Sequence, residues 1–149
     1  MKSVTSLVYE YRELEAQRSV TPWALSVADN QRLGALGRAF EARDGGRRQY
    51  ARKPVIGSGE LHVGLARTEL DIMDLGVGGA KVGCALPLAT GQRAVLRVFD
   101  PRTGATMDFQ CEVAWRGPAT LGLRFFGAPA LTPPLPQTRQ MARSCTIGW

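Results

Sequence analysis

Apolar residues recur at helical spacing near the start of the chain. Between Ser3 and Arg18 they stand three or four residues apart, at Val4, Leu7, Val8, Tyr11 and Leu14. Side chains at this spacing lie on one side of an α-helix. The pattern therefore predicts an amphipathic helix with a single apolar stripe.

A second helix is expected directly after the Thr21-Pro22 pair, because threonine can cap a helix and proline suits its first turn. It should end before Gly45-Gly46. Gly34 and Gly37 weaken its helix propensity. Its apolar face is imperfect and consists of Val27, Leu33, Leu36 and Phe40.

Two helices joined by a short connection form an antiparallel hairpin, which we assign to residues 1–46. The apolar stripe of the first helix is wider than one short partner can cover. We therefore expect the hairpin to dock on the rest of the chain, or to bind a protein partner or a second copy, with the homodimer slightly favoured.

The pattern changes after Gly46 to short β-like runs separated by turn residues. The runs are 60–67, 69–73, 80–84, 93–99, 106–115 and 121–126. Gly76 to Gly79, Pro87 to Gly91, Asp100 to Gly104 and Gly117-Pro118 supply the turns between them. Short strands without intervening helices predict a mainly β fold, a small antiparallel barrel over residues 47–127. The Pro-rich remainder, 128–149, is expected to be an extended tail with a short helical turn near 137–143.

The net charge of +6 is unevenly distributed. Residues 1–46 carry six basic and six acidic groups, whereas 47–127 carry eleven basic and seven acidic groups. The excess is concentrated at Arg47, Arg48, Arg52 and Lys53, with no acidic residue before Glu60. A nucleotide, a nucleic acid or an acidic surface would complement this segment, and a solvated basic loop is the plain alternative.

Several functional classes lack support in the sequence. Cys84, Cys111 and Cys145 are an odd number without metal-ligand spacing, and His62, the only histidine, sits in an alternating stretch typical of a strand. No signal peptide or membrane span is recognisable, so a cytoplasmic protein is expected. Nor is there a paired carboxylate, a nucleophile-base spacing, a P-loop or a Rossmann glycine pattern, and we expect neither an enzyme nor a cofactor.

Two short segments carry the specific signal. Arg47-Arg48-Gln49-Tyr50-Ala51-Arg52 precedes the first strand, and Asp74-Leu75-Gly76-Val77-Gly78-Gly79 lies in a turn between two strands. Together they resemble the RxxxR and [DN]xSxxG motifs of PilZ domains, which are bacterial receptors for cyclic di-GMP. Arg48 and Arg52 match the first motif, preceded by Arg47, while Asp74 and Gly79 match the ends of the second. The resemblance implies a PilZ-type barrel whose ligand-binding residues are Arg47, Arg48, Arg52, Asp74, Gly76 and Gly79.

The chemistry of these residue types agrees with that ligand. The planar guanidinium of arginine can bond a phosphate or the O6/N7 edge of guanine and can stack on a base. An aspartate can accept from guanine N1 and N2, and glycines allow close backbone approach and tolerate positive φ. The closing runs Glu112 to Trp115 and Leu121 to Phe125 also resemble the family, and we interpret them as core without a ligand role.

One position departs from the family pattern. Gly76 stands where the motif has serine, so the hydroxyl that would bond the ligand is missing, and affinity could fall by about ten- to a hundredfold. A frame that starts at Asp71 would put Met73 at the serine position, but the Asp74 frame is preferred because Gly79-Ala80 then falls where the strand resumes.

We therefore expect a cyclic di-GMP receptor that changes conformation or partner binding when the arginine segment closes over its ligand. The main alternative is a degenerate PilZ adaptor that binds no nucleotide and acts through the helical hairpin. A nucleic-acid polymer is disfavoured, because the strands lack an aromatic stacking platform with interleaved basic residues.

Overall fold

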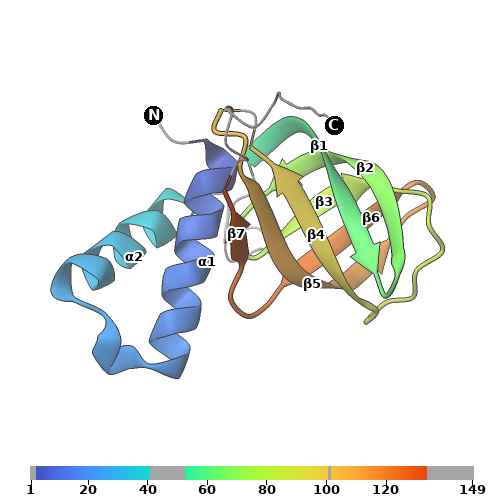
Figure 1. Ribbon diagram of the computed structural model, residues 1–149. Helices are drawn as coiled ribbons and strands as arrows, with labels where there is room; N and C mark the ends of the chain where they lie inside the picture. The colour runs from blue at the N-terminus through green and yellow to red at the C-terminus, as the bar shows by residue number, and fades with distance from the viewer. Residues whose placement is uncertain (1–2, 41–52, 101, 134–149) are drawn as a thin grey trace, which may run out of the picture.

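The computed structural model describes residues 3–40, 53–100 and 102–133. Two helices come first, α1 (Val4–Val20) and α2 (Val27–Ala39), joined by a short 3-10 helix η1 (Pro22–Ala24). They form the predicted hairpin beside a barrel of strands (Figure 1). The predicted end of the second helix, the arginine segment and the helical turn near 137–143 fall within 41–52 and 134–149, which lie outside the described residues.

The second helix begins later than predicted. Thr21 makes no side-chain capping bond, and Pro22 starts η1 instead of α2. Ser26 and Asp29 form a capping box: the Ser26 hydroxyl accepts from the Asp29 N–H at 3.0 Å, and the Asp29 carboxylate accepts from the Ser26 N–H at 3.4 Å. This reciprocal cap satisfies two helix-end donors, so the helix starts at Val27. Val27 is consequently exposed, which corrects its assignment to the apolar face.

The remaining chain forms the predicted antiparallel barrel. Its strands are β1 (Lys53–Val63), β2 (Ala66–Leu75), β3 (Gly79–Gly83), β4 (Arg93–Phe99), β5 (Thr106–Arg116) and β6 (Thr120–Phe125). The order β4-β1-β2-β3-β6-β5 closes on itself through an additional β4–β5 pairing. Closure removes the exposed edges of an open sheet. A further short strand, β7 (Ala130–Thr132), pairs with β5. It lies at the start of the segment 128–149, for which the sequence predicts an extended tail.

The run 60–67, predicted as one strand, is in fact a hairpin. Val63 pairs with Ala66 across a tight turn at Gly64-Leu65, where Gly64 has φ +58. A two-residue hairpin loop usually requires positive φ, and glycine is the residue that adopts it without strain. The apolar residues Leu65 and Ala66 that follow made the sequence look continuous, but both are exposed.

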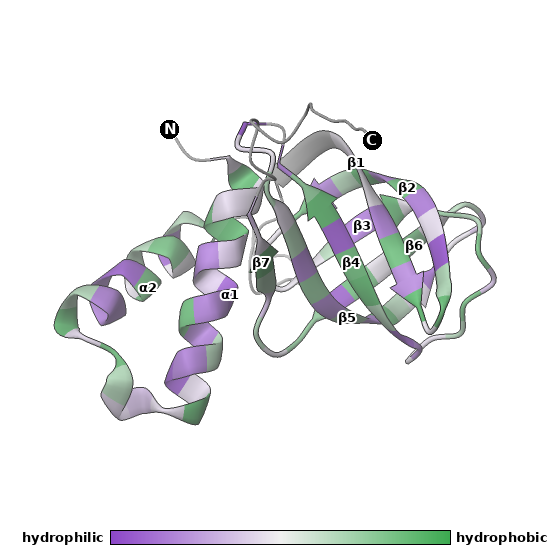
Figure 2. Cartoon of the chain, in the orientation of Figure 1, coloured by the Kyte–Doolittle hydropathy of each residue, from purple (hydrophilic) through white to green (hydrophobic). Residues whose placement is uncertain are grey.

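The barrel interior is filled from alternate positions of each strand, visible as alternating colours in Figure 2. Phe109 and Phe125 stack inside the core with ring centroids 4.9 Å apart. Cys84 and Cys111 are buried free thiols, as the lack of a disulfide framework predicted. Burial raises the pKa of Cys111 to about 12, so this thiol is a core residue rather than a nucleophile.

Helix α1 is docked on the barrel. Val8 and Tyr11 belong to the same buried cluster as the barrel interior, and the ring of Tyr9 meets Phe109 edge-on at 6.4 Å. The Ser6 hydroxyl donates to Asp100 at 3.3 Å, and the Arg12 guanidinium donates to the carbonyl of Gly127 at 3.0 Å. The apolar stripe is thus packed against α2 and the barrel together, which is the docking alternative and not the slightly favoured homodimer.

None of the helices among the described residues combines the length and the apolar character needed to cross a bilayer.

Candidate functional site

The segment around Asp74 forms a closed turn at the end of β2. The Gly76 N–H donates to the Gly79 carbonyl at 2.8 Å, and β3 resumes at Gly79, as the preferred frame required. One oxygen of Asp74 accepts from the backbone N–H of Lys81 at 3.2 Å. The Phe125 N–H donates to the Gly78 carbonyl at 2.9 Å, which attaches the turn to β6. The turn is therefore held on both sides by the barrel.

The glycines of this turn do not have positive φ; the positive-φ glycines of the described chain are Gly64, Gly91, Gly104 and Gly127. Gly79 instead serves close packing. A Cβ on Gly79 would collide with the carbonyl of Leu123, because β3 and β6 approach closely there. A Cβ on Gly78 would meet nothing within 4 Å, and that residue is exposed.

Arg47, Arg48 and Arg52 lie outside the described residues, but the strand that follows them can be placed. Lys53 pairs with Leu75 and Pro54 pairs with Asp74 in the β1–β2 ladder. Paired Cα atoms are about 4.5 to 5.5 Å apart. The register therefore places Lys53, the residue that follows the first motif in sequence, at the same end of the β1–β2 ladder as Asp74.

A row of paired residues extends from Asp74 across the barrel surface. Asp74 pairs with Lys81, Lys81 with Gly122, and Gly122 with Trp115. Directly paired residues share a face of the sheet. Neighbouring strands are about 4.8 Å apart, so the row is roughly 14 Å long. It joins the predicted carboxylate to a lysine and an aromatic ring on the outside of the barrel.

Trp115 is the residue that sequence reasoning missed. Its indole lies directly against Gly122, where any Cβ would overlap the ring, and 38% of the residue is exposed. Strand alternation through Met107, Phe109, Cys111 and Val113 predicts an inward Trp115. A register shift between Val113 and Trp115 breaks the alternation and turns the ring outward. Its interpretation as core is therefore wrong, and the sequence shows no signal for the bulge.

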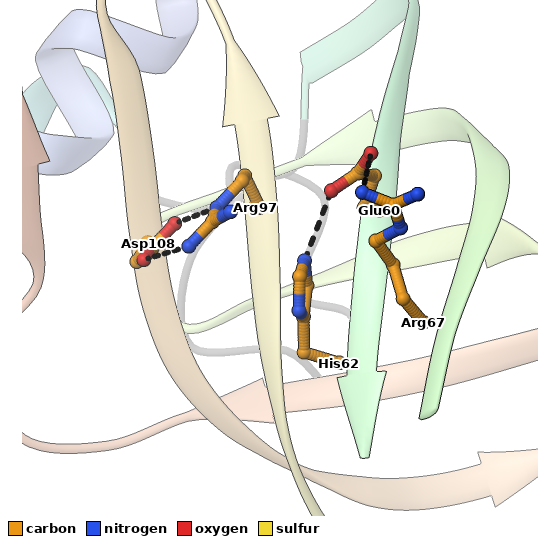
Figure 3. Close-up of polar contacts among 5 residues, drawn as sticks. All are labelled: Glu60, His62, Arg67, Arg97 and Asp108. Atoms are coloured by element: carbon orange, nitrogen blue, oxygen red, sulfur yellow. Dashed lines mark hydrogen bonds and ion pairs between the residues drawn. The ribbon is translucent and has the colours of Figure 1, made fainter. Parts of the chain in front are cut away.

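Other charged groups on the barrel surface are paired with one another. Figure 3 shows Glu60 between His62, 3.0 Å from its Nε2, and Arg67, at 3.8 Å. In the same view Arg97 makes two hydrogen bonds to Asp108, at 2.8 and 3.0 Å. His62 is a surface strand residue with a carboxylate partner, as its alternating context predicted. These pairs are only partly buried, and ion pairs near the surface contribute little to stability.

The described residues hold no group of three or more histidine, cysteine, aspartate or glutamate side chains that could bind a metal ion. The chemistry available on the Asp74 row is instead hydrogen bonding, charge attraction and stacking. A planar ring, a cation and a carboxylate arranged over roughly 14 Å are suited to a flat, anionic ligand with hydrogen-bond donors.

Comparison with known proteins gives one family-model match. The family model described as PilZ domain matches residues 46–132. A solved structure, titled "Crystal structure of PilZ domain of CeSA from cellulose synthesizing bacterium", is similar to the chain at 19% sequence identity. The similarity covers 50% of this chain and 79% of that chain, with a TM-score of 0.46. No curated protein matches the sequence.

Proposed function

The chain belongs to the PilZ domain family, and we propose that it is a non-enzymatic receptor for cyclic di-GMP. The single observation that supports this most is the pairing of Pro54 with Asp74. Pro54 follows the RxxxR segment by two residues, and Asp74 opens the second motif. Two motifs that are 22 residues apart in sequence can then contact one ligand.

Each part of the proposed surface has a chemical role. Arg48 and Arg52 would bond the phosphates and the O6/N7 edges of the guanines. Asp74 would accept from guanine N1 and N2. A carboxylate has about four lone-pair positions, so Asp74 can serve both Lys81 and a base. Lys81 adds positive charge within the row.

Trp115 extends the proposed surface beyond the residues of the two motifs. An exposed indole held flat on Gly122 offers a face on which a guanine can stack. Stacking on an aromatic side chain is worth about 1 to 3 kcal/mol per base. We therefore include Lys81 and Trp115 with the arginines, Asp74, Gly76 and Gly79 in the proposed site.

Receptor function also requires an output, and the docked hairpin is the proposed one. The turn that carries Gly78 is bonded to Phe125, and two residues later the Gly127 carbonyl accepts from Arg12 of α1. Ligand contacts that prefer one arrangement of the turn would favour one arrangement of α1 through these bonds.

The test of the proposal is calorimetric titration of the full chain with cyclic di-GMP, with cyclic di-AMP as the matched control. Both ligands carry the same two phosphates, but only guanine offers O6 and the N1 and N2 donors. We expect saturable heat with cyclic di-GMP and at least about tenfold weaker binding of cyclic di-AMP, the discrimination expected of about 1.4 kcal/mol. No saturable heat with either ligand would favour the adaptor that binds no nucleotide. The glycine at position 76, where the motif has serine, is the reason to retain that alternative.

A further inference from the structure

The tip of the helical hairpin exposes a cluster of apolar side chains. Val20 is 74% exposed, Trp23 is 81% exposed and Val27 is 75% exposed, and Pro22 and Ala24 between them are also exposed. The tip is the connection between α1 and α2, and hydrophobic segments are visible there in Figure 2. Isolated exposed apolar residues are ordinary, but a contiguous cluster marks an interaction surface.

The tip is held in one conformation by backbone hydrogen bonds. The Thr21 N–H donates to the Gln17 carbonyl at 2.8 Å, and the Ala24 N–H donates to the Thr21 carbonyl at 2.9 Å. Leu25, in contrast to its neighbours, is buried and anchors the turn. Trp23 is therefore presented outward from an ordered turn. An exposed tryptophan in a fixed position is typical of a residue that dominates binding in an interface.

A cavity of about 530 Å³ lies next to this cluster. Its walls include Arg12, Ala16 and Val20 of α1, and Gly127 and Ala128 of the turn after β6. The cavity is open to solvent, and its volume is large enough to admit an aromatic side chain. Val20 belongs both to the exposed cluster and to the cavity wall, so the protruding residue and the cavity are adjacent on one surface.

We propose that this surface binds a second copy of the chain, with Trp23 of each copy inserted into the cavity of the other. A two-fold symmetric interface requires a protrusion and a recess on the same patch, so that each contact occurs twice. The two-fold axis then passes near Val20. This surface is separate from the Asp74 row and does not depend on nucleotide binding.

Charge and area both agree with self-association. The cavity rim carries Arg12 together with Glu13 and Glu15, and Arg18 follows on the same helix. Because the rim mixes both signs, an antiparallel α1 of a second copy can set acidic groups opposite basic ones. A buried tryptophan contributes about 150 to 250 Å². With two valines and the cavity walls, the interface would reach the lower part of the usual range, near ~600 Å² per copy, which suits a reversible dimer.

Sedimentation velocity of the full chain at increasing protein concentration tests the proposal. We expect a monomer–dimer equilibrium for the wild type and a monomer for Trp23→Ala and for Ala128→Arg, which fills the cavity. Leu65→Ala is the matched control, because Leu65 is fully exposed at the β1–β2 turn and should leave the dimer intact. The thermal melt of Trp23→Ala should show no loss of monomer fold, since the side chain makes few contacts.

A second measurement locates the axis. Val20→Cys in a Cys145→Ser background should give a disulfide-linked dimer under mild oxidation, because Cys84 and Cys111 are buried and do not compete. Leu65→Cys in the same background should not. A wild-type chain that stays monomeric, a Trp23→Ala variant that dimerises like the wild type, or a dimer that fails to cross-link at position 20 would each overturn the proposal.

Discussion

Gly76 is the residue at which this chain differs most informatively from the motif it resembles. It is buried, and its N–H closes the turn onto the Gly79 carbonyl. Its φ is not among the positive values of the described glycines, so backbone strain is not the reason for glycine here. A serine at this position would therefore change only the contact with the ligand and the packing around the side chain.

Gly76→Ser should restore a hydrogen-bond donor beside the proposed nucleotide and tighten cyclic di-GMP binding by up to about tenfold, the equivalent of roughly 1.4 kcal/mol. Calorimetry measures the affinity, and a thermal melt without ligand serves as the control for packing. A lowered melting temperature would show that the buried site has no room for the side chain. Unchanged stability with unchanged or weaker affinity would contradict the Asp74 frame and favour the Asp71 frame.

Trp115 allows a second test at the level of one side chain. Trp115→Ala should weaken cyclic di-GMP binding by at least about tenfold, because a lost base–aromatic stack costs about 1 to 3 kcal/mol. Trp23→Ala is the matched control, since that ring is also exposed but lies on the hairpin tip. Fluorescence titration and calorimetry would measure both. Equal affinities of the two variants would remove Trp115 from the proposed site.

At the scale of elements, the sequence predicted types better than boundaries. The helix stripe and the strand runs were recognisable because burial imposes their periods. Three features could not be recognised, because each depends on a pairing partner or a competing cap. They are the hairpin at Gly64, the bulge before Trp115 and the late start of α2. For the candidate site this means that Asp74 could be predicted from its motif, whereas Lys81 and Trp115 joined it only through register.

The junction between α1 and the barrel can be tested at Asp100. This residue is only 2% exposed, and it accepts from the Ser6 hydroxyl and from the Arg102 N–H at 3.0 Å. Asp100→Ala would remove the acceptor of the part-buried Ser6 hydroxyl, and a hydrogen bond to a charged group is lost, so the free energy of unfolding should fall by about 1 to 3 kcal/mol.

Glu69→Ala is the matched control for Asp100→Ala. Glu69 is exposed on β2 and stands directly opposite Glu60, so its removal should change stability by less than about 0.5 kcal/mol. Urea unfolding of both variants measures the two free energies. A similar small loss in both would show that Asp100 does not hold the helix to the barrel.

In a receptor whose output is the helical hairpin, the proposed site and the hairpin influence each other across the molecule. Arg12 is the contact between α1 and the segment after β6, and burial lowers its pKa without removing its charge near neutral pH. Arg12 donates to the carbonyl of Gly127, which lies two residues after Phe125, and Phe125 in turn donates to the carbonyl of Gly78. This short path is the physical connection that we propose for the output.

Hydrogen exchange tests that connection. Cyclic di-GMP should slow amide exchange in α1 of the wild type, and Arg12→Ala should abolish this effect while leaving nucleotide affinity within about threefold, because Arg12 is not in the proposed site. Arg18→Ala is the control, since Arg18 pairs with Glu15 on the exposed side of α1. Equal protection in wild type and Arg12→Ala would mean that the signal takes another path.

Both motifs are proposed to hold one nucleotide. Calorimetric titration of cyclic di-GMP into the wild type, Arg52→Ala, Asp74→Ala and the double variant tests this proposal. We predict that each single variant binds at least about tenfold more weakly, and that the double variant loses less than the product of the two losses, because the residues act on the same ligand. Arg67→Ala, an exposed arginine on β2, should bind like the wild type. Wild-type affinity in either Arg52→Ala or Asp74→Ala would contradict the account.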